Sequence, residues 1–339
     1  MNVLVTGGAG FIGRWVVQRL LAEGHDVMAV DDLSNGRAEN VKDFVDNEHF
    51  LGLTQADVTD SGRVREIFAM REWDIVFHLA ASIHVQKSID DPGTTFRNDV
   101  VGTFNVLEAA RSVFFRLNGL DGSASFDYAS AVPKITKRTP RVVCMSTCMV
   151  YELAGSDPIG EAHPLRPASP YAASKIAADM LALSYHNAYS MPVTVVRPFN
   201  TYGPFQKTNG EGGVVAIFLR RALSGDPLLV KGTGEQTRDL LFVEDCAEFV
   251  VAAASSRQAE GRVLNAGTGR DVTMRDLAAL CKGKSLVEHV PHDHPQAEIA
   301  RLCCDASAAR ATLGWAPRTP LADGLEKTRQ WLAENRWAW

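Results

Sequence analysis

Apolar runs of strand length alternate with amphipathic stretches of helix length along the first 200 residues of the chain. This alternation is typical of a parallel sheet that carries helices on both faces. The expected strands cover residues 2–6, 26–30, 75–79, 141–146 and 193–197, and the expected helices cover 12–23, 94–117 and 170–189. The pattern therefore predicts an α/β fold built on a doubly wound parallel sheet.

The alternation breaks after residue 200, where glycines and prolines punctuate the chain and one helix is expected at 214–224. A helix at 244–255 and a short strand at 262–266 indicate a return to the sheet. We predict a sheet domain and a smaller C-terminal substrate-binding lobe. The domain is expected to cover 1–200 with 241–267 returning to it, and the lobe 201–240 and 268–339.

The charges are nearly balanced, with 35 basic and 40 acidic residues mixed along the chain. No basic field exists that would concentrate nucleic acid or anionic lipid, so neither is an expected partner. The sequence shows no signal peptide and no apolar run of the roughly 18 residues that a membrane span needs. We expect a cytoplasmic protein.

The six cysteines lack the Cys-x-x-Cys spacing of a zinc site, and their pattern is not that of a secreted disulfide framework. His292 and His294 offer two metal-ligating groups, but they lie in a Pro-containing stretch that reads as a solvated loop. No metal site is predicted.

A glycine-rich turn directly follows the first expected strand and opens the first expected helix. It contains Gly7, Gly10 and Gly13, three residues apart, with Phe11 and Ile12 between the last two. Glycine permits the tight turn, the approach of a pyrophosphate to the backbone and close helix–strand packing, while the helix start supplies free N–H groups. The strand–turn–helix context makes this a Rossmann-type dinucleotide site.

Carboxylates end the second expected strand. Asp31 and Asp32 follow Gly13 by 18 and 19 residues, where a carboxylate can accept hydrogen bonds from the adenosine ribose and would repel a 2′-phosphate. This favours NAD over NADP, although Arg37 lies close enough in sequence to offset the repulsion. Asp57 and Val58 stand where a third strand would end. They could contact the adenine, or they could form a simple surface turn.

Tyr171 and Lys175 lie four residues apart on the helix that opens at residue 170, and so share one face. A lysine ammonium and the positive nicotinamide ring would together lower the pKa of the phenol, which could then take a hydroxyl proton as hydride leaves the same carbon. Thr147, at the end of the preceding strand, could relay that proton. These three residues are the predicted catalytic set.

With these motifs, the chain resembles the extended short-chain dehydrogenase/reductases of the nucleotide-sugar epimerase and dehydratase group. The segments that carry the resemblance span nearly the whole chain: 6–13 (TGGAGFIG), 31–36 (DDLSNG), 78–81 (HLAA), Asn98 with Gly102–Thr103, 171–175 (YAASK), 197–204 (RPFNTYGP) and 236–239 (QTRD). The resemblance implies a tightly held NAD, a nucleotide-diphosphate sugar as substrate, and a homodimer joined by the two long helices that follow Thr94 and Pro170.

The resemblance also implies binding residues that the spacing alone does not predict. Further cofactor contacts are Asn35, Leu79, Ala80, Ala81 and Asn98, beside Tyr171 and Lys175 themselves. The implied substrate contacts are Thr147, Asn200, Val215, Arg238 and Arg301, with Asn200 and Arg238 near the diphosphate, which an arginine fork binds well.

The chain departs from the family where the chemistry divides. Family members that eliminate water or decarboxylate carry an acidic residue, usually Glu, two places after the threonine, whereas this chain has Cys148 and Met149. A 4-epimerase needs no such base, because it oxidises C4 and returns the same hydride to the other face of the ketosugar. We therefore expect an NAD-dependent nucleotide-sugar 4-epimerase, with UDP-sugars as the first substrates to consider.

Two alternatives stay open. Cys148 could act as the proton-transfer residue of a dehydratase if its pocket lowers the pKa of the thiol, or it could be a small buried side chain. A protein that kept the fold only to sense NAD would tolerate Tyr171→Phe, and the intact set of Thr147, Tyr171 and Lys175 argues against that role.

Overall fold

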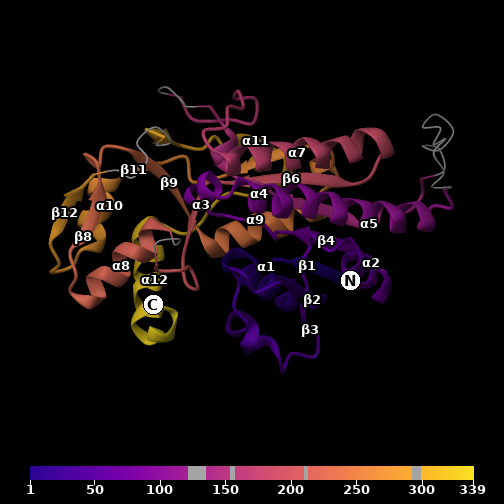
Figure 1. Cartoon of the computed structure of the whole chain (residues 1–339), viewed down its shortest axis with the longest axis horizontal. Helices are drawn as coiled ribbons and strands as arrows, with labels where there is room; N and C mark the ends of the chain where they lie inside the picture. Colours follow the sequence, from indigo (N-terminus) through magenta and orange to yellow (C-terminus); the bar gives the residue numbers. More distant parts are fainter. Residues whose placement is uncertain (121–134, 153–156, 210–212, 292–298) are drawn as a thin grey trace. The chain divides into compact units, whose positions relative to one another are not determined.

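Seven strands form the predicted doubly wound sheet in the computed structural model of the chain (Figure 1), in the spatial order β10-β6-β5-β4-β1-β2-β3. These strands are β1 (Asn2–Thr6), β2 (Asp26–Asp31), β3 (Phe50–Gln55), β4 (Ile75–His78), β5 (Arg141–Met145), β6 (Val193–Pro198) and β10 (Val263–Ala266). The pairings from β3 to β6 are all parallel. The strand order reverses between β1 and β4, which is where folds of this kind bind ligands.

The structure describes residues 1–120, 135–152, 157–209, 213–291 and 299–339. They divide into two compact units. Unit 1 comprises Met1–Val150, Ser169–Arg197 and Val250–Leu264, and unit 2 comprises Tyr151–Ala168, Pro198–Phe249 and Asn265–Trp339. The expected sheet domain included 151–168, whereas the structure assigns this stretch to unit 2.

Helices cover both faces of the sheet in unit 1. Its helical elements, with the π-helical turn η2, are α1 (Phe11–Ala22), η1 (Ala38–Phe44), α2 (Ser61–Met70), α3 (Val85–Asp90), α4 (Pro92–Phe96), η2 (Arg97–Val101), α5 (Gly102–Leu117), η4 (Cys148–Val150), α7 (Pro170–Tyr189) and η5 (Arg257–Ala259). One apolar cluster joins Leu4 of β1 to residues of α2, α5 and α7, and Figure 1 shows α5 and α7 side by side. Val3 and Val5 face the other way and are also fully buried, beneath the side where α1 contacts β1.

Unit 2 contains smaller sheets around an apolar core of its own. Its elements are β7 (Asn200–Tyr202), α8 (Val214–Ser224), β8 (Leu228–Lys231), β9 (Thr237–Phe242), β11 (Asp271–Thr273), α10 (Met274–Cys281), β12 (Val287–Val290), β13 (Arg301–Leu302), α11 (Ser307–Leu313), α12 (Leu321–Glu334) and η7 (Arg336–Ala338), while α9 (Val243–Ser255) contributes residues to both units. Strand β9 pairs with β7, β11 and β13. The core includes Tyr202, Phe218, Leu219 and Phe242.

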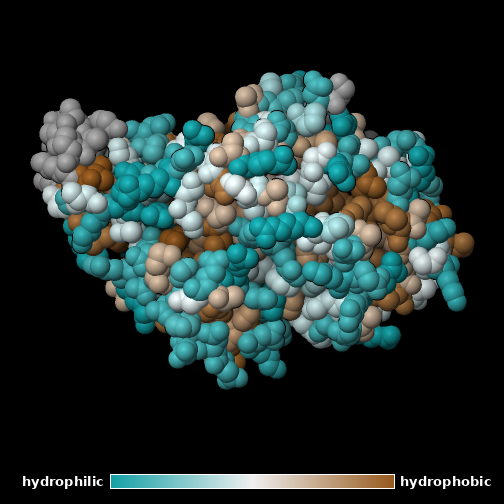
Figure 2. Space-filling model, turned by 180° about the vertical axis from the view of Figure 1, so that it is seen from behind, coloured by the Kyte–Doolittle hydropathy of each residue, from teal (hydrophilic) through white to brown (hydrophobic). Residues whose placement is uncertain are grey.

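The surface of the protein is largely polar on one face. On the face seen in Figure 2, hydrophilic residues predominate and apolar residues form smaller separate areas. In the part of the chain that the structure describes, no helix has the length and apolar character needed to cross a membrane.

Candidate active site

The glycine-rich turn joins β1 to α1 at the point where the strand order reverses. Gly7 has φ +69°, and a Cβ there would lie 2.7 Å from the backbone nitrogen of Ala80. A Cβ on Gly13 would lie 2.0 Å from the carbonyl oxygen of Gly7. Both positions therefore require glycine, the first for its conformation and both for the close approach of backbone to backbone.

The start of α1 has the donors that a pyrophosphate needs. Gly10 is the N-cap and has no side chain to cap the helix, and the first helical bond runs from the N–H of Arg14 to the Gly10 carbonyl. The N–H groups of Phe11, Ile12 and Gly13 therefore have no partner within the helix. Together with the positive end of the helix dipole they fit an anionic group.

The structure distinguishes the two carboxylates after β2. Asp31 is buried beside the turn and accepts hydrogen bonds from the N–H groups of Ala9 (3.1 Å) and Leu33 (2.9 Å). Burial raises the pKa of Asp31, and these backbone hydrogen bonds lower it. Asp32 is exposed and accepts from the N–H of Ser34 (2.9 Å). Asp31 thus lies against the glycine-rich turn, and the ribose contacts expected of Asp31 and Asp32 stay predictions.

Further predicted cofactor residues follow the carboxyl ends of β2, β3 and β4, at the same edge of the sheet as the glycine-rich turn. Asn35 has a buried Oδ1 without a hydrogen-bond partner among the described residues, which suits a ligand donor. Asp57 is exposed and Val58 is buried, directly after β3. The N–H groups of Leu79 and Ala80 bind the carbonyl and hydroxyl of Thr6, at 3.1 and 3.3 Å, so the segment 79–81 lies against the end of β1.

His78 fixes this edge of the sheet rather than taking part in proton transfer. Its Nδ1 lies 2.8 Å from the Thr6 hydroxyl and its Nε2 lies 3.0 Å from the Thr103 hydroxyl, so the ring connects β1, β4 and α5. Burial, with the nearby charge of Lys175, lowers the pKa of His78 to about 3. The ring is therefore neutral across the pH range in which an enzyme would be assayed.

Tyr171 and Lys175 lie in the first turns of α7. The helix begins where it does because the Ser169 side chain caps the N–H of Ala172 (3.2 Å) and Pro170 occupies the first helical position. Tyr171 is 7% exposed and its phenol hydrogen-bonds the side chain of Thr147. The structure therefore brings the side chains of Tyr171 and Thr147 together, as the sequence predicted.

Lys175 is also buried, and its Nζ donates to the carbonyl oxygen of Met145 at 2.7 Å. The pKa of Tyr171 is raised, first by burial and next by the negative charge of Asp99, while the hydrogen bond to Thr147 lowers it. The expected lowering of this pKa is thus not a property of the protein groups alone. The lowering expected from Lys175 together with a bound nicotinamide ring stays a prediction.

Cys148 and Met149 follow Thr147 in the short turn η4. Cys148 is 3% exposed and forms no disulfide, and its charge, when present, raises the pKa of Tyr171. The N–H of Met149 donates to the Thr147 hydroxyl at 3.2 Å, which fixes that hydroxyl beside the phenol. Neither side chain at these positions is a carboxylate.

The sequence analysis named Asn98 but not its neighbour Asp99, which the structure buries beside Ser174, the residue before Lys175. Asn98 is half-buried, whereas Asp99 is fully buried and accepts hydrogen bonds from the N–H of Ser82 and from the hydroxyl of Ser174, both at 2.7 Å. The available signal was a carboxylate inside an expected helix, directly before the apolar residues Val100 and Val101. Its meaning depends on the π-helical turn η2, which shifts the faces of the helix.

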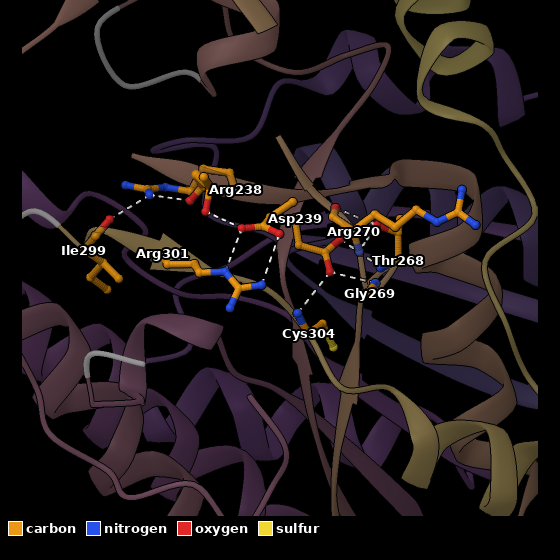
Figure 3. Close-up of polar contacts among 10 residues, drawn as sticks. Arg238, Asp239, Thr268, Gly269, Arg270, Ile299, Arg301 and Cys304 are labelled. Carbon is orange, nitrogen blue, oxygen red and sulfur yellow. Dashed lines mark hydrogen bonds and ion pairs between the residues drawn. The ribbon is translucent and has the colours of Figure 1, made fainter. Parts of the chain in front are cut away.

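Of the predicted substrate residues, Thr147 lies in unit 1 and the other four lie in unit 2. Arg238, on β9, donates from Nη1 to the carbonyls of Thr237 (2.7 Å) and Ile299 (2.8 Å), and it points away from its neighbour Asp239 (Figure 3). Asn200, on β7, has a buried Oδ1 that lacks a partner among the described residues. The predicted substrate contacts of Asn200 and Arg238 stay predictions.

Two other predicted contacts have partners within unit 2. Arg301 pairs with Asp271 at 2.9 Å, and Val215 is 1% exposed in the apolar core of the unit. Asp239 organises the neighbouring loop through Thr268, Gly269 and Cys304 (Figure 3). The predicted roles of Arg301 and Val215 stay predictions.

His292 and His294 lie outside the described residues. Within the described ranges, no three His, Cys, Asp or Glu side chains gather where they could hold a metal ion.

Comparison with known proteins identifies relatives for this site. The model of a family described as "NAD dependent epimerase/dehydratase family" matches residues 3–267. The UDP-glucose 4-epimerase of Mycolicibacterium smegmatis is 37% identical over 330 residues, 97% of each chain. The dTDP-glucose 4,6-dehydratase of Neisseria gonorrhoeae is 34% identical, over 99% of this chain and 96% of that protein.

Among solved structures, Pal from Bacillus thuringiensis is similar with a TM-score of 0.89 and 47% identity. The similarity covers 98% of this chain and 99% of that one. The relatives thus include both reaction types that the residues at 148 and 149 leave open.

Proposed function

Because the chain belongs to the NAD dependent epimerase/dehydratase family, we propose that it is a nucleotide-sugar 4-epimerase that acts on a UDP-sugar through a transient 4-keto intermediate. The observation that carries this proposal is a complete buried set of Thr147, Tyr171 and Lys175 without a carboxylate at positions 148 and 149. The similarity to a named UDP-glucose 4-epimerase supports it.

The residues of unit 1 have separate parts in the proposed reaction. The glycine turn and Asp31 would hold NAD, which would accept the hydride from C4 and return it to the same carbon. Tyr171 takes the C4 hydroxyl proton as the hydride leaves. It gives the proton back after the ketosugar has rotated to present its opposite face. Thr147, held by the N–H of Met149, positions the hydroxyl group for this transfer.

Lys175 contributes charge and position to the same step. Its bond to the Met145 carbonyl uses one of three N–H donors and anchors the ammonium against β5, within a turn of Tyr171. The fixed positive charge stabilises the phenolate form that accepts the proton. Because no carbon-bound proton has to be removed, no further base is required.

We further propose that unit 2 holds the nucleotide diphosphate. Asn200 and Arg238 are the first candidates, since an amide and a guanidinium suit phosphate oxygens. Val215 and Arg301 would contact the nucleotide base or support the neighbouring strands. Val215 lies in the apolar core, and Arg301 forms the ion pair with Asp271.

The helices α5 and α7 are proposed as the contact of a homodimer. Phe104 on α5 is 45% exposed and Met180 on α7 is 45% exposed, and Phe96, just before η2, is 54% exposed. Large apolar side chains exposed on neighbouring helices are typical of surfaces that a partner covers.

An isotope experiment tests the epimerase proposal. The NAD-loaded protein is incubated in deuterated water with UDP-glucose, UDP-glucuronate and their N-acetyl relatives, and the sugars are returned to ordinary water before mass spectrometry. We expect a product isomeric with its substrate and free of carbon-bound deuterium. Deuterium at a ring carbon, or loss of water, would contradict the proposal.

A dehydratase is the second candidate, and the burial of Cys148 beside Tyr171 is the observation in its favour. In that reaction Cys148 would take the C5 proton as water leaves. Its signature is a product lighter by one water that Cys148→Ala abolishes. The 4-epimerase proposal instead predicts that Cys148→Ala keeps turnover within about threefold of the unmodified enzyme, as a small buried side chain permits.

A further inference from the structure

The first turn of α7 carries Tyr171, and its backbone N–H groups have no acceptors in a preceding turn of helix. Pro170 has no N–H to satisfy. The N–H of Ala172 donates to the Ser169 side chain at 3.2 Å, and that of Ala173 donates to the Ser169 carbonyl at 3.0 Å. The residues at the start of α7 therefore account for every N–H of this turn except that of Tyr171 itself.

Ser88, on α3, supplies the remaining acceptor. Its Oγ accepts the N–H of Tyr171 at 3.1 Å and donates to the carbonyl oxygen of Val85 at 2.6 Å. Because its hydrogen is directed at Val85, the hydroxyl presents a lone pair to Tyr171. Ser88 is 0% exposed and Tyr171 is 7% exposed, so little water reaches this contact. A buried N–H that loses its partner is unfavourable, and the start of α7 is therefore held where this bond forms.

The segment that leads to Ser88 starts at the edge of the sheet that carries the glycine-rich turn. The N–H of Ala80 donates to the Thr6 hydroxyl at 3.3 Å, which holds the segment against the end of β1. The N–H of Ser82 donates to a buried carboxylate of η2 at 2.7 Å. The segment then forms α3, which contacts α7. An anchored stretch of chain therefore connects the predicted cofactor edge to the backbone of Tyr171.

We propose that Ser88 is a positioning residue for the reaction, whose hydroxyl fixes the backbone of Tyr171 so that the phenol stays in hydrogen-bond contact with Thr147. It acts through Tyr171 and is not itself a catalytic residue. This inference rests on the proposed role of Tyr171 as the proton acceptor. A displacement of about 1 Å at a reacting group can slow a reaction by about 100-fold, so the loss of one buried hydrogen bond that holds the group is expected to show in the rate.

The expected effect of Ser88 on Tyr171 is one of position and not of charge. Burial raises the pKa of the phenol, the side-chain hydrogen bond to Thr147 lowers it, and three ionisable groups raise it further: Asp99, Cys148 and Asp179. Ser88 is neutral, and its contact with Tyr171 is to the backbone. Removal of its Oγ leaves those ionisable groups in the protein, so a change in the pKa of the phenol would report that the phenol has moved relative to Thr147.

Ser88→Ala tests the proposal, because it removes the Oγ and leaves the Cβ in place. Ser184→Ala is the matched control: the Ser184 hydroxyl also donates to the carbonyl three residues earlier, at 2.7 Å, but it is exposed on α7. The ionisation of the phenol is followed by ultraviolet difference absorbance on the NAD-loaded protein without substrate. Each variant is compared with the same variant carrying Tyr171→Phe, which isolates the signal of Tyr171 from that of the other tyrosines.

In Ser88→Ala we expect the midpoint of the Tyr171 titration to rise by about 0.5 pH unit or more, because a weakened bond to Thr147 favours the protonated phenol. The kcat should fall by about 10-fold to 100-fold. The KM for the sugar should stay within about twofold, since the lost interaction serves the transfer step and not binding. Ser88→Cys, whose sulfur is a weak acceptor, should give an intermediate midpoint. Ser184→Ala should change neither the midpoint nor kcat.

An unmoved midpoint in Ser88→Ala would overturn the proposal. If thermal stability fell while the midpoint stayed in place, the bond would support the fold alone, and the proposal would be overturned equally. A normal kcat in this variant would also contradict it. Because the titration needs no sugar, it distinguishes the two proposals: failure of every nucleotide sugar to react in the unmodified enzyme would contradict the proposed function, while the midpoint would still decide the role of Ser88.

Discussion

Tyr171→Phe is expected to lower kcat by about 10³-fold, the range that loss of a positioned acid–base group produces. The substitution removes one oxygen, which hydrogen-bonds Thr147 inside a buried cluster, and leaves the ring in place. Oxidation at C4 then has no group to take the hydroxyl proton as hydride departs. NAD content and thermal stability should change little, because the glycine turn and the core are untouched.

Tyr189→Phe is the matched control, since it removes the same atom from the last residue of the same helix. It should keep near-normal kcat. If Tyr171→Phe retained more than a tenth of the original kcat with NAD bound, the phenol would not be the proton acceptor, and the catalytic assignment would be wrong.

Gly13→Ala is expected to abolish NAD binding and to lower the free energy of unfolding by about 3 kcal/mol, the upper part of the range for overpacking. The added Cβ would lie 2.0 Å from the Gly7 carbonyl oxygen, and the nearest atoms belong to backbone rather than to movable side chains. The turn and the start of α1 must therefore separate. NAD retained after purification and the midpoint of thermal unfolding measure the two effects.

Gly93→Ala provides the comparison, because its Cβ would meet nothing closer than 3.6 Å and only side-chain atoms. It should bind NAD as the unmodified chain does. Normal NAD content in Gly13→Ala would contradict the placement of the cofactor on this turn.

The sequence predicted best where local chemistry determines structure. The observed helix α7 has the predicted bounds, because Ser169, Pro170 and the apolar spacing agree on where it begins. The glycine turn was equally predictable, since its requirements arise within a few residues. The fold class and the NAD cofactor were confirmed by the sheet and by the family.

What the sequence could not show depends on departures from regular geometry. The helix expected over 94–117 is divided into α4, the π-helical turn η2 and α5, and periodicity assumes a constant turn. That turn is why Asp99 lies beside Ser174 while Asn98 is only half-buried. The raised pKa of Tyr171 depends on burial by segments far apart in the chain, which spacing does not reveal.

Unit 2 was hardest to predict for a related reason. Its strands are short, and β9 pairs with β7, β11 and β13, which come from distant parts of the sequence. Strand β3 in unit 1 was also indistinct, because most of its residues are half-buried and give no clear alternation. Long-range pairing rather than local preference determines these elements.

In the proposed reaction one hydride leaves C4 of a nucleotide sugar and returns to C4 within a turnover at the Tyr171 site. UDP-glucose with deuterium at C4 tests this transfer, with the product analysed by NMR and mass spectrometry. We expect a C4 epimer that keeps the full label at C4. Deuterium at C6 together with loss of water, or release of the label to solvent, would show that the hydride does not return to C4 and that the enzyme is not a 4-epimerase.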